Sequence, residues 1–357
     1  MKPGMAMGLG TAALVAAVAV CATTGCGSVG YIARSTGGHL DLASKAKPVA
    51  EWLEDEKTPP KLRERLALSQ RMRDFAVSEL KLPENRSYRS YAELGRPYAV
   101  WNVVAAPELS LQLKTWCFPL FGCAGYRGYF DVHEADELGE QLRRESWEVS
   151  VYGVPAYSTL GWTDFLGGDP LLNTFIHQPE GELARLIFHE LAHQVAYAKD
   201  DTEFNESFAT TVERIGAGRW LQEHASEATK AQYDLLDSRR RDFRRLTRAT
   251  REQLDALYRS AAPDERKREG KAALMARMRA DYERMKAERW GGYAGYDGWF
   301  QRANNASLAV QGAYDDLVPD FERLFEREGR DFTRFYAEVL RLAALPKDAR
   351  HATLRAI

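Results

Sequence analysis

The chain has 357 residues, 45% of them hydrophobic, and its 49 basic and 51 acidic residues give a formal net charge of −2. This length and hydrophobicity suffice for one large core or two smaller ones, and they exclude extensive disorder. A nucleic-acid partner normally requires a clear basic excess, so we expect no nucleic-acid binding.

Residues 1–25 have the order of a secretory signal peptide. Lys2 precedes an apolar run at residues 8–22, which is too short to span a membrane comfortably. The following TTGC resembles the lipobox of bacterial lipoproteins, although Thr23 stands where leucine is usual. The resemblance implies that Cys26 is acylated and becomes the mature N-terminus. A plain signal peptide with an incidental cysteine is the alternative.

A lipid on Cys26 would attach the protein to a membrane. By resemblance to the sorting rules of Gram-negative envelopes, Gly27 favours the outer membrane over the inner one. We therefore expect a lipid-anchored protein of the cell envelope that faces the periplasm. Residues 26–37 are expected to form a tether, and residues 38–357 the folded domain.

Two further cysteines, Cys117 and Cys123, lie six positions apart in WCFPLFGC. In an oxidising periplasm this spacing predicts a short disulfide loop. Two buried free thiols are the alternative. A zinc ribbon would need four such ligands and lacks two.

Hydrophobic spacing predicts helices over residues 38–82 and 134–146. β-Branched and aromatic residues predict strands within 98–113, 125–131 and 147–160. A modest sheet is therefore expected in the first half of the domain.

The next segment is predicted to be helical. One helix begins near Pro179, with Glu180 and Glu182 in its favoured acidic first turn. It is expected to reach about Ala198, where KDDT reverses the chain into a second helix that ends near Gly216.

Residues 226–290 are highly charged and have a helical pattern, and SAAPDE at 260–265 is predicted to form a turn within them. This pattern predicts a long helical hairpin. The basic run SRRRDFRRLTR at 238–248 is interleaved with acids, so we expect a solvated face and not a nucleic-acid patch.

His189 and His193 lie four residues apart in HELAH and therefore share one helix face, with Cβ atoms about 6 Å apart. This spacing lets both imidazoles bind one Zn²⁺. Glu190 is rotated from His189 by about 100°, so it misses the ion but reaches a water bound to it. We predict two metal ligands and a general base. An ordinary pair of polar histidines on an amphipathic helix is the alternative.

A catalytic zinc needs a third protein ligand and one open position. Glu206 is the candidate, because a second helix after a short turn returns beside the first. Glu213, two helical turns later, is predicted to accept a hydrogen bond from a ligand histidine. The neighbouring Asn205 is predicted to support the ligands as well.

HELAHQ followed by NESFATTVE resembles the gluzincin clan of metallopeptidases, and especially its aminopeptidase branch, although the segment between the two motifs is shorter here. The closer resemblance is to a bacterial family of putative aminopeptidases, which are predicted lipoproteins. It extends from about residue 38 to 345. The shared motifs are FHELAHQ and DDTEFNESFAT within 188–210, VWNVVAAPE (100–108), YRGYF (126–130), AYSTLGW (156–162), DPLLNT (169–174) and NNA (304–306).

The resemblance implies an α+β fold: a mainly helical, zincin-like metallopeptidase with a small mixed sheet before the HExxH helix and an inserted helical hairpin. It implies zinc as cofactor and hydrolysis of short peptides. In this clan a tyrosine or histidine from a later helix often stabilises the oxyanion. Tyr314 is the best candidate, with Tyr293 and Tyr296 next. A core tyrosine is the alternative reading of Tyr314.

The clan also pairs an extended substrate with a strand before the active helix, for which AYSTLGW at 156–162 is the candidate; an interior strand is the alternative. Gluzincin aminopeptidases bind the substrate's α-amine with a GxMxN loop and a glutamate, but no GxMxN precedes His189. Asp164, Asp169 or Glu134 would have to serve. An endopeptidase or peptidoglycan amidase is therefore a second hypothesis. A non-catalytic lipoprotein that binds a partner through the hairpin is a third.

Overall fold

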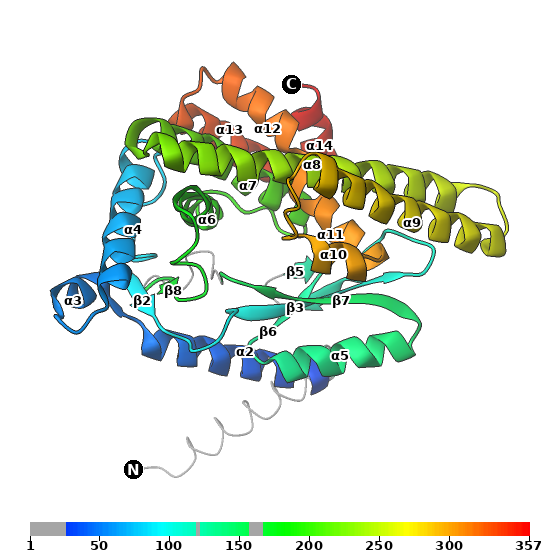
Figure 1. The fold of residues 1–357 in the computed structure, drawn as a ribbon, viewed down its shortest axis with the longest axis horizontal. Coiled ribbons are helices and arrows are strands. Elements are labelled where there is room, and N and C mark those ends of the chain that lie inside the picture. The colour runs from blue at the N-terminus through cyan, green and yellow to red at the C-terminus, as the bar shows by residue number, and fades with distance from the viewer. Residues whose placement is uncertain (1–25, 119–121, 157–166) are drawn as a thin grey trace, which may run out of the picture.

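The computed structural model describes residues 26–118, 122–156 and 167–357. The predicted signal peptide and nearly all of the predicted edge strand AYSTLGW lie outside these ranges. The described chain is mostly helical with small sheets, in agreement with an α+β fold (Figure 1). No helix within these ranges is long and apolar enough to cross a membrane.

The first helices are α2 (Cys26–Lys45), α3 (Val49–Glu54) and α4 (Pro60–Ser78). Residues 26–37, which were expected to form a tether, are the first part of α2. This part of the helix contacts the sheet: the Tyr31 hydroxyl donates a hydrogen bond to the Gly128 carbonyl at 2.9 Å. The Tyr31 ring also meets Tyr129 edge-on, with centroids 5.5 Å apart.

The main sheet has the order β6-β3-β7 and is antiparallel. Its strands are β3 (Val100–Pro107), β6 (Arg127–Tyr129) and β7 (Trp147–Val154). Alternate side chains of β3 face two helices: Val103 packs with α5 (Val132–Arg144), and Val104 packs with α11 (Asn305–Asp315). Helices α2 and α5 lie below the sheet in Figure 1. The sheet is thus held between helical layers.

Two smaller sheets flank this one. The strands β1 (Lys47–Pro48), β2 (Ser90–Ala92) and β8 (Leu171–Leu172) form a mixed sheet. The strands β4 (Trp116–Phe118) and β5 (Gly122–Ala124) form a hairpin, and the predicted disulfide between Cys117 and Cys123 joins them.

The two motifs lie on α6 (Glu180–Ala192) and α7 (Thr202–His224). Helix α6 begins as predicted but ends earlier, with His193 at its C-cap. Beyond it, Asn85 and Ser87 hold the Gln194 side chain, at 2.6 and 3.1 Å, and so direct the chain away from the helix. Helix α7 extends beyond the predicted end at Gly216.

A large core joins α4, α6 and α7 to three C-terminal helices. These are α12 (Val318–Arg327), α13 (Phe332–Ala343) and α14 (Lys347–Arg355). Phe208 of α7 lies at the centre, with its ring 5.9 Å from those of Phe321 and Phe335. Aromatic burial on this scale fixes α7 against the C-terminal helices.

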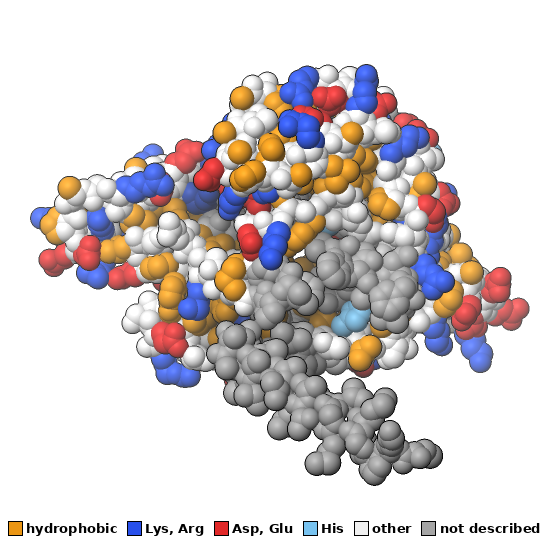
Figure 2. Space-filling view, turned by 180° about the vertical axis from the view of Figure 1, so that it is seen from behind, with side chains coloured by type: hydrophobic (Ala, Val, Ile, Leu, Met, Phe, Trp, Pro, Cys, Tyr) orange, Lys and Arg blue, Asp and Glu red, His pale blue; other side chains and the backbone are white. Residues whose placement is uncertain are grey.

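The helices α8 (Glu227–Arg259) and α9 (Asp264–Glu288) form a long hairpin across the molecule (Figure 1). The hairpin has its own aromatic core, in which Tyr282 stacks on Phe300 of α10 (Asp297–Arg302) at 4.0 Å. On the face opposite to that in Figure 1, acidic and basic side chains are interspersed (Figure 2).

Two glycines of α7 should respond oppositely to alanine. A Cβ at Gly216 would lie 2.6 Å from Leu80 Cδ1 and 2.9 Å from Phe188 Cδ2, so Gly216→Ala should cost about 1–3 kcal/mol of unfolding free energy. No heavy atom lies within 4 Å of a Cβ at Gly218, so Gly218→Ala should stabilise the helix by up to about 1 kcal/mol. Urea unfolding measures both changes. Equal stabilisation by both variants would contradict the close packing at Gly216.

Candidate metal centre

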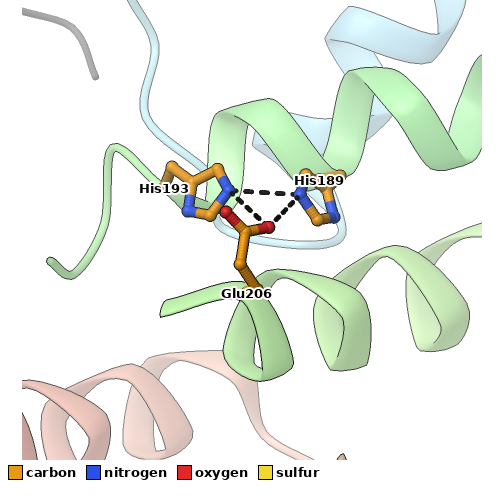
Figure 3. Close-up of side chains that lie close together, drawn as sticks. All are labelled: His189, His193 and Glu206. Carbon is orange, nitrogen blue, oxygen red and sulfur yellow. Dashed lines mark hydrogen bonds and ion pairs between the residues drawn. The ribbon is translucent and has the colours of Figure 1, made fainter. Parts of the chain in front are cut away.

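Three side chains of α6 and α7 converge on one point (Figure 3). His189 Nε2 lies 3.2 Å from Glu206 Oε2, and His193 Nε2 lies 3.6 Å from the same oxygen. The two Nε2 atoms are 3.1 Å apart. One ligand atom from each residue lies within 4.8 Å of the others, so this set could hold a metal ion. Two imidazoles and one carboxylate are ligands that zinc accepts.

The antiparallel packing of α6 and α7 brings these residues together. His189 lies in the last turn of α6, His193 caps that helix, and Glu206 lies in the first turns of α7. The start of α7 is fixed by Asp201, whose carboxylate accepts a hydrogen bond from the Phe204 amide at 3.2 Å.

The C-terminal helix holds the same carboxylate. Asp201 is fully buried and contacts Arg350 and His351 of α14, the latter at 2.9 Å. Because a buried carboxylate is costly without partners, these contacts fix where α7 begins. The position of Glu206 thus depends on residues at the far end of the chain.

Glu213 approaches the other side of His189, at 3.0 Å between Oε2 and Nδ1. This is within hydrogen-bonding distance, and such a partner sets the tautomer and orientation of a ligand imidazole. The other oxygen of Glu213 accepts hydrogen bonds from Arg185, at 3.1 Å from Nε. Arg185 Nη1 in turn lies 3.5 Å from Asp237 of α8. A line of charges therefore runs from a candidate ligand to the hairpin.

The charges of the site shift its pKa values strongly. Burial alone would raise the pKa of Glu206, but His193 and His189 outweigh it and lower that pKa. Burial would also raise the pKa of Glu213, but Arg185 and His189 outweigh this effect and lower that pKa to about 2. Burial would lower the pKa of His189, yet Glu206 and Glu213 raise it well above its ordinary value. Without a metal, this site therefore retains a proton on His189.

Glu190 is adjacent to His189 and partly buried. Desolvation raises the pKa of its carboxyl group; His189 and His193 oppose this, and Glu206 and Asp169 add to it. A carboxylate with a raised pKa accepts a proton more readily, which suits a general base.

The other residues predicted for the site lie in different parts of the structure. The Asn205 side chain bonds to the backbone nitrogen and oxygen of Ala198, at 2.7 and 2.9 Å. It therefore supports the loop before α7. Tyr314 lies on α11, but its side chain is outside the described part of the structure. Tyr293 and Tyr296 belong to the aromatic core of the hairpin.

Two tyrosines that were not predicted lie near the site. Tyr126 precedes β6, and Tyr152 lies on β7. Desolvation raises both pKa values, that of Tyr152 to about 12, and the charge of Glu206 adds to both shifts. Glu190 also contributes at Tyr126. Both phenols therefore stay protonated and can donate a hydrogen bond at neutral pH. Tyr126 opens the YRGYF motif, which was the available sequence signal.

Tyr88 lies in a strained loop beside the end of α6. Its φ is 63°, a left-handed value that costs a bulky residue about 1–3 kcal/mol. The backbone is held by the Tyr88 amide donating to the Asp169 carbonyl at 2.6 Å and by Gln70 donating to the Tyr88 carbonyl at 3.0 Å. The buried hydroxyl has no hydrogen-bond partner among the described residues. Burial raises its pKa, and the charge of Glu190 adds to the shift.

The three candidates for binding a substrate amine differ in their position relative to the candidate metal ligands. Asp169 is 1% exposed and close enough to Glu190 to affect its pKa. Glu134 pairs with Arg34 at 3.0 Å on the α2 and α5 side of the sheet. Asp164 lies outside the described residues. Asp169 is therefore the described candidate near the metal centre.

A family model described as "Putative aminopeptidase" matches residues 30–354, which is most of the chain. The chain belongs to the putative aminopeptidase family. No curated protein and no solved structure gives a significant match. Membership of this family indicates peptidase activity, and the matched region includes α6, α7 and the sheet tyrosines.

Metal binding by this family member should release about one proton per chain near neutral pH, because the ion displaces the proton on His189. Because the pKa of His189 is raised, the affinity for the metal should increase with pH up to that pKa and then level off. Titration calorimetry in buffers of different ionisation enthalpy measures the released proton.

Two variants of α7 with the same chemical change test this prediction: Glu206→Gln removes a candidate ligand, and Glu203→Gln is the control. Glu206→Gln should weaken binding severely because a ligand is lost. Glu203 approaches Arg355 at 3.7 Å and is not one of the candidate ligands, so Glu203→Gln should bind the metal like the wild type. A binding enthalpy that is independent of the buffer would reject a protonated metal-free site.

Proposed function

We propose that the protein is a zinc-dependent peptidase of the gluzincin type that acts in the cell envelope. The decisive observation is the convergence of His189, His193 and Glu206 next to the partly buried Glu190. Two nitrogen ligands and one oxygen ligand suit zinc and leave a fourth position for water. A purely structural metal site would have no use for Glu190.

Bound zinc would polarise the scissile carbonyl and activate a water. Glu190 would take a proton from that water and later deliver it to the leaving amine. Tyr126 and Tyr152 are candidates for the hydroxyl that stabilises the developing oxyanion, since their raised pKa values keep them protonated. Tyr314 stays a candidate from the sequence alone.

The substrate is proposed to be a short peptide with a free N-terminus. Family membership supports this choice, and Asp169 offers a buried carboxylate near Glu190. An endopeptidase or peptidoglycan amidase is the second candidate, because the chain lacks the GxMxN loop.

We further propose that Cys26 carries the lipid and that the protein is attached to the outer membrane, facing the periplasm. Helix α2 begins at Cys26, and it lies with α5 on the side of the sheet away from the hairpin (Figure 1). This arrangement would turn the α2 side toward the membrane. The wild-type protein should incorporate a radiolabelled fatty acid, and the Cys26→Ala variant should not.

Glu190→Gln should retain zinc but lower peptide hydrolysis by about 10²- to 10⁴-fold, because the general base is lost while all three ligands stay in place. Metal analysis and steady-state kinetics measure the two effects. Glu203→Gln is the matched control and should keep full activity. Unchanged turnover in Glu190→Gln would reject its role.

A peptide panel separates the candidate functions. Activity should disappear on chelation and return with zinc, and it should require a free N-terminus. Cleavage of N-blocked peptides would favour the endopeptidase or amidase. No cleavage by the fully metal-loaded protein would favour a non-catalytic lipoprotein.

A further inference from the structure

A pocket lies between α7, α8, α11 and the start of α12, with a volume of about 270 Å³. Arginines dominate its lining. They are Arg214 of α7 and Arg241, Arg244, Arg245, Arg248 and Arg251 of α8. We call this cavity the arginine pocket. Within the described chain, Asp316 is the one acidic residue in its lining.

Helical spacing explains how one helix supplies five of these arginines. They follow Arg241 at three, four, seven and ten residues, which places all five on one side of α8. The two preceding arginines point elsewhere: Arg240 contacts Glu182 of α6, and Arg239 lies over the Tyr293 ring at 4.1 Å. Within the basic run, Arg239 and Arg240 therefore contact other elements, whereas Arg241, Arg245 and Arg248 are exposed and pair with acids of α8, as expected of a solvated face.

Five of the pocket arginines, Arg214, Arg241, Arg245, Arg248 and Arg251, each pair with an acidic side chain. Arg251 pairs with both oxygens of Asp316, at 3.3 and 2.9 Å, and so neutralises the one acid of the lining. Arg245 and Arg248 each contact one acidic side chain of their own helix, at 3.4 and 3.1 Å. A guanidinium has five N–H donors, so a single contact does not saturate it.

These arginines are also accessible to a ligand. The side chains of Arg245 and Arg248 are 71% and 57% exposed, whereas Arg214 and Arg251 are 33% and 20% exposed. Two arginines are thus more buried and two form the outer part of the pocket. Exposed ion pairs contribute little, about 0.2–1 kcal/mol each, so an anionic ligand can recruit the outer arginines at small cost.

We propose that the arginine pocket binds a phosphate group. Phosphate offers several charged acceptor oxygens, and the planar guanidinium fork binds two of them at once. None of the candidate metal ligands lines this pocket, so the proposal does not rest on the proposed peptidase function. The group could belong to a free phosphate or monoester, or to the headgroup of an anionic phospholipid.

The surroundings favour one phosphate group over a long polyanion. Asp242 and Glu252 lie on α8 beside the pocket and pair with its outer arginines, and Glu322 of α12 pairs with Arg214 at 3.2 Å. These carboxylates would repel a chain of phosphates that extended beyond the pocket. The net charge of −2 adds no long-range attraction for such a chain.

The test compares two double variants with the same change of charge. Arg245→Gln/Arg248→Gln alters the pocket. Arg266→Gln/Arg277→Gln on α9 is the control: those side chains are 74% and 72% exposed, and each pairs with one acid of its own helix. Thermal unfolding should show that both variants fold like the wild type.

Inorganic phosphate is titrated into each intact protein by calorimetry at constant ionic strength, with chloride as reference. Vesicles of phosphatidylcholine with and without phosphatidylglycerol form a second arm, in which each chain also carries Cys26→Ser so that no N-terminal lipid contributes. The pocket variant should bind phosphate at least about tenfold more weakly, and the control should stay within about twofold. Any phosphate bound at the metal centre would persist equally in both variants.

Binding of inorganic phosphate that only the pocket variant loses would support a free phosphate or monoester as ligand. Binding only to phosphatidylglycerol vesicles, again lost only in the pocket variant, would support a lipid headgroup. No binding in either arm, or equal loss in both variants, would overturn the proposal.

Discussion

A line of largely buried charges between α6 and α7 determines how the molecule is assembled. Glu206 contacts both histidines, Glu213 contacts His189 from the opposite side, and Arg185 compensates Glu213. A carboxylate left unpaired here would cost several kcal/mol, so the two helices keep the register that pairs both Glu206 and Glu213. Glu206 and Glu213 are seven residues apart, or about 10 Å along the helix, which allows His189 to fit between them with one ring nitrogen toward each.

That register is maintained by contacts far from it in sequence. Asp201 fixes the first turn of α7 through Arg350 and His351, and Asn205 fixes the preceding loop through Ala198. The aromatic core around α7 resists sliding of the helix, because any shift would separate close-packed rings. Residues from distant parts of the chain therefore position a few polar atoms of the candidate site.

The predictability of the site follows from the range of the interactions. His189, His193 and Glu206 were predictable because helical spacing and a short return are local properties. The early end of α6 was not, since it depends on Asn85 and Ser87, more than a hundred residues away. The YRGYF motif contains Tyr126 but does not indicate its place near the candidate ligands, and Tyr152 has no such signal, because the sheet approaches these ligands through tertiary packing. The contacts of Tyr31 with the sheet also join residues about a hundred positions apart, so no local pattern at residues 26–37 indicated them.

The hairpin makes charged contacts with Glu182 and Arg185 of α6, the helix that carries the candidate ligand His189. Asp237 of α8 extends the charge line by contacting Arg185, and Arg240 of the same helix contacts Glu182 near the start of α6. Removing α8 would take Asp237 from Arg185 and would deprive Glu182, whose pKa burial already raises, of its partner Arg240. One side of α8 compensates charges next to a candidate ligand, and another side lines the arginine pocket. The helix is therefore an integral part of the fold. Asp237 of the hairpin is thus connected to His189 through Arg185 and Glu213.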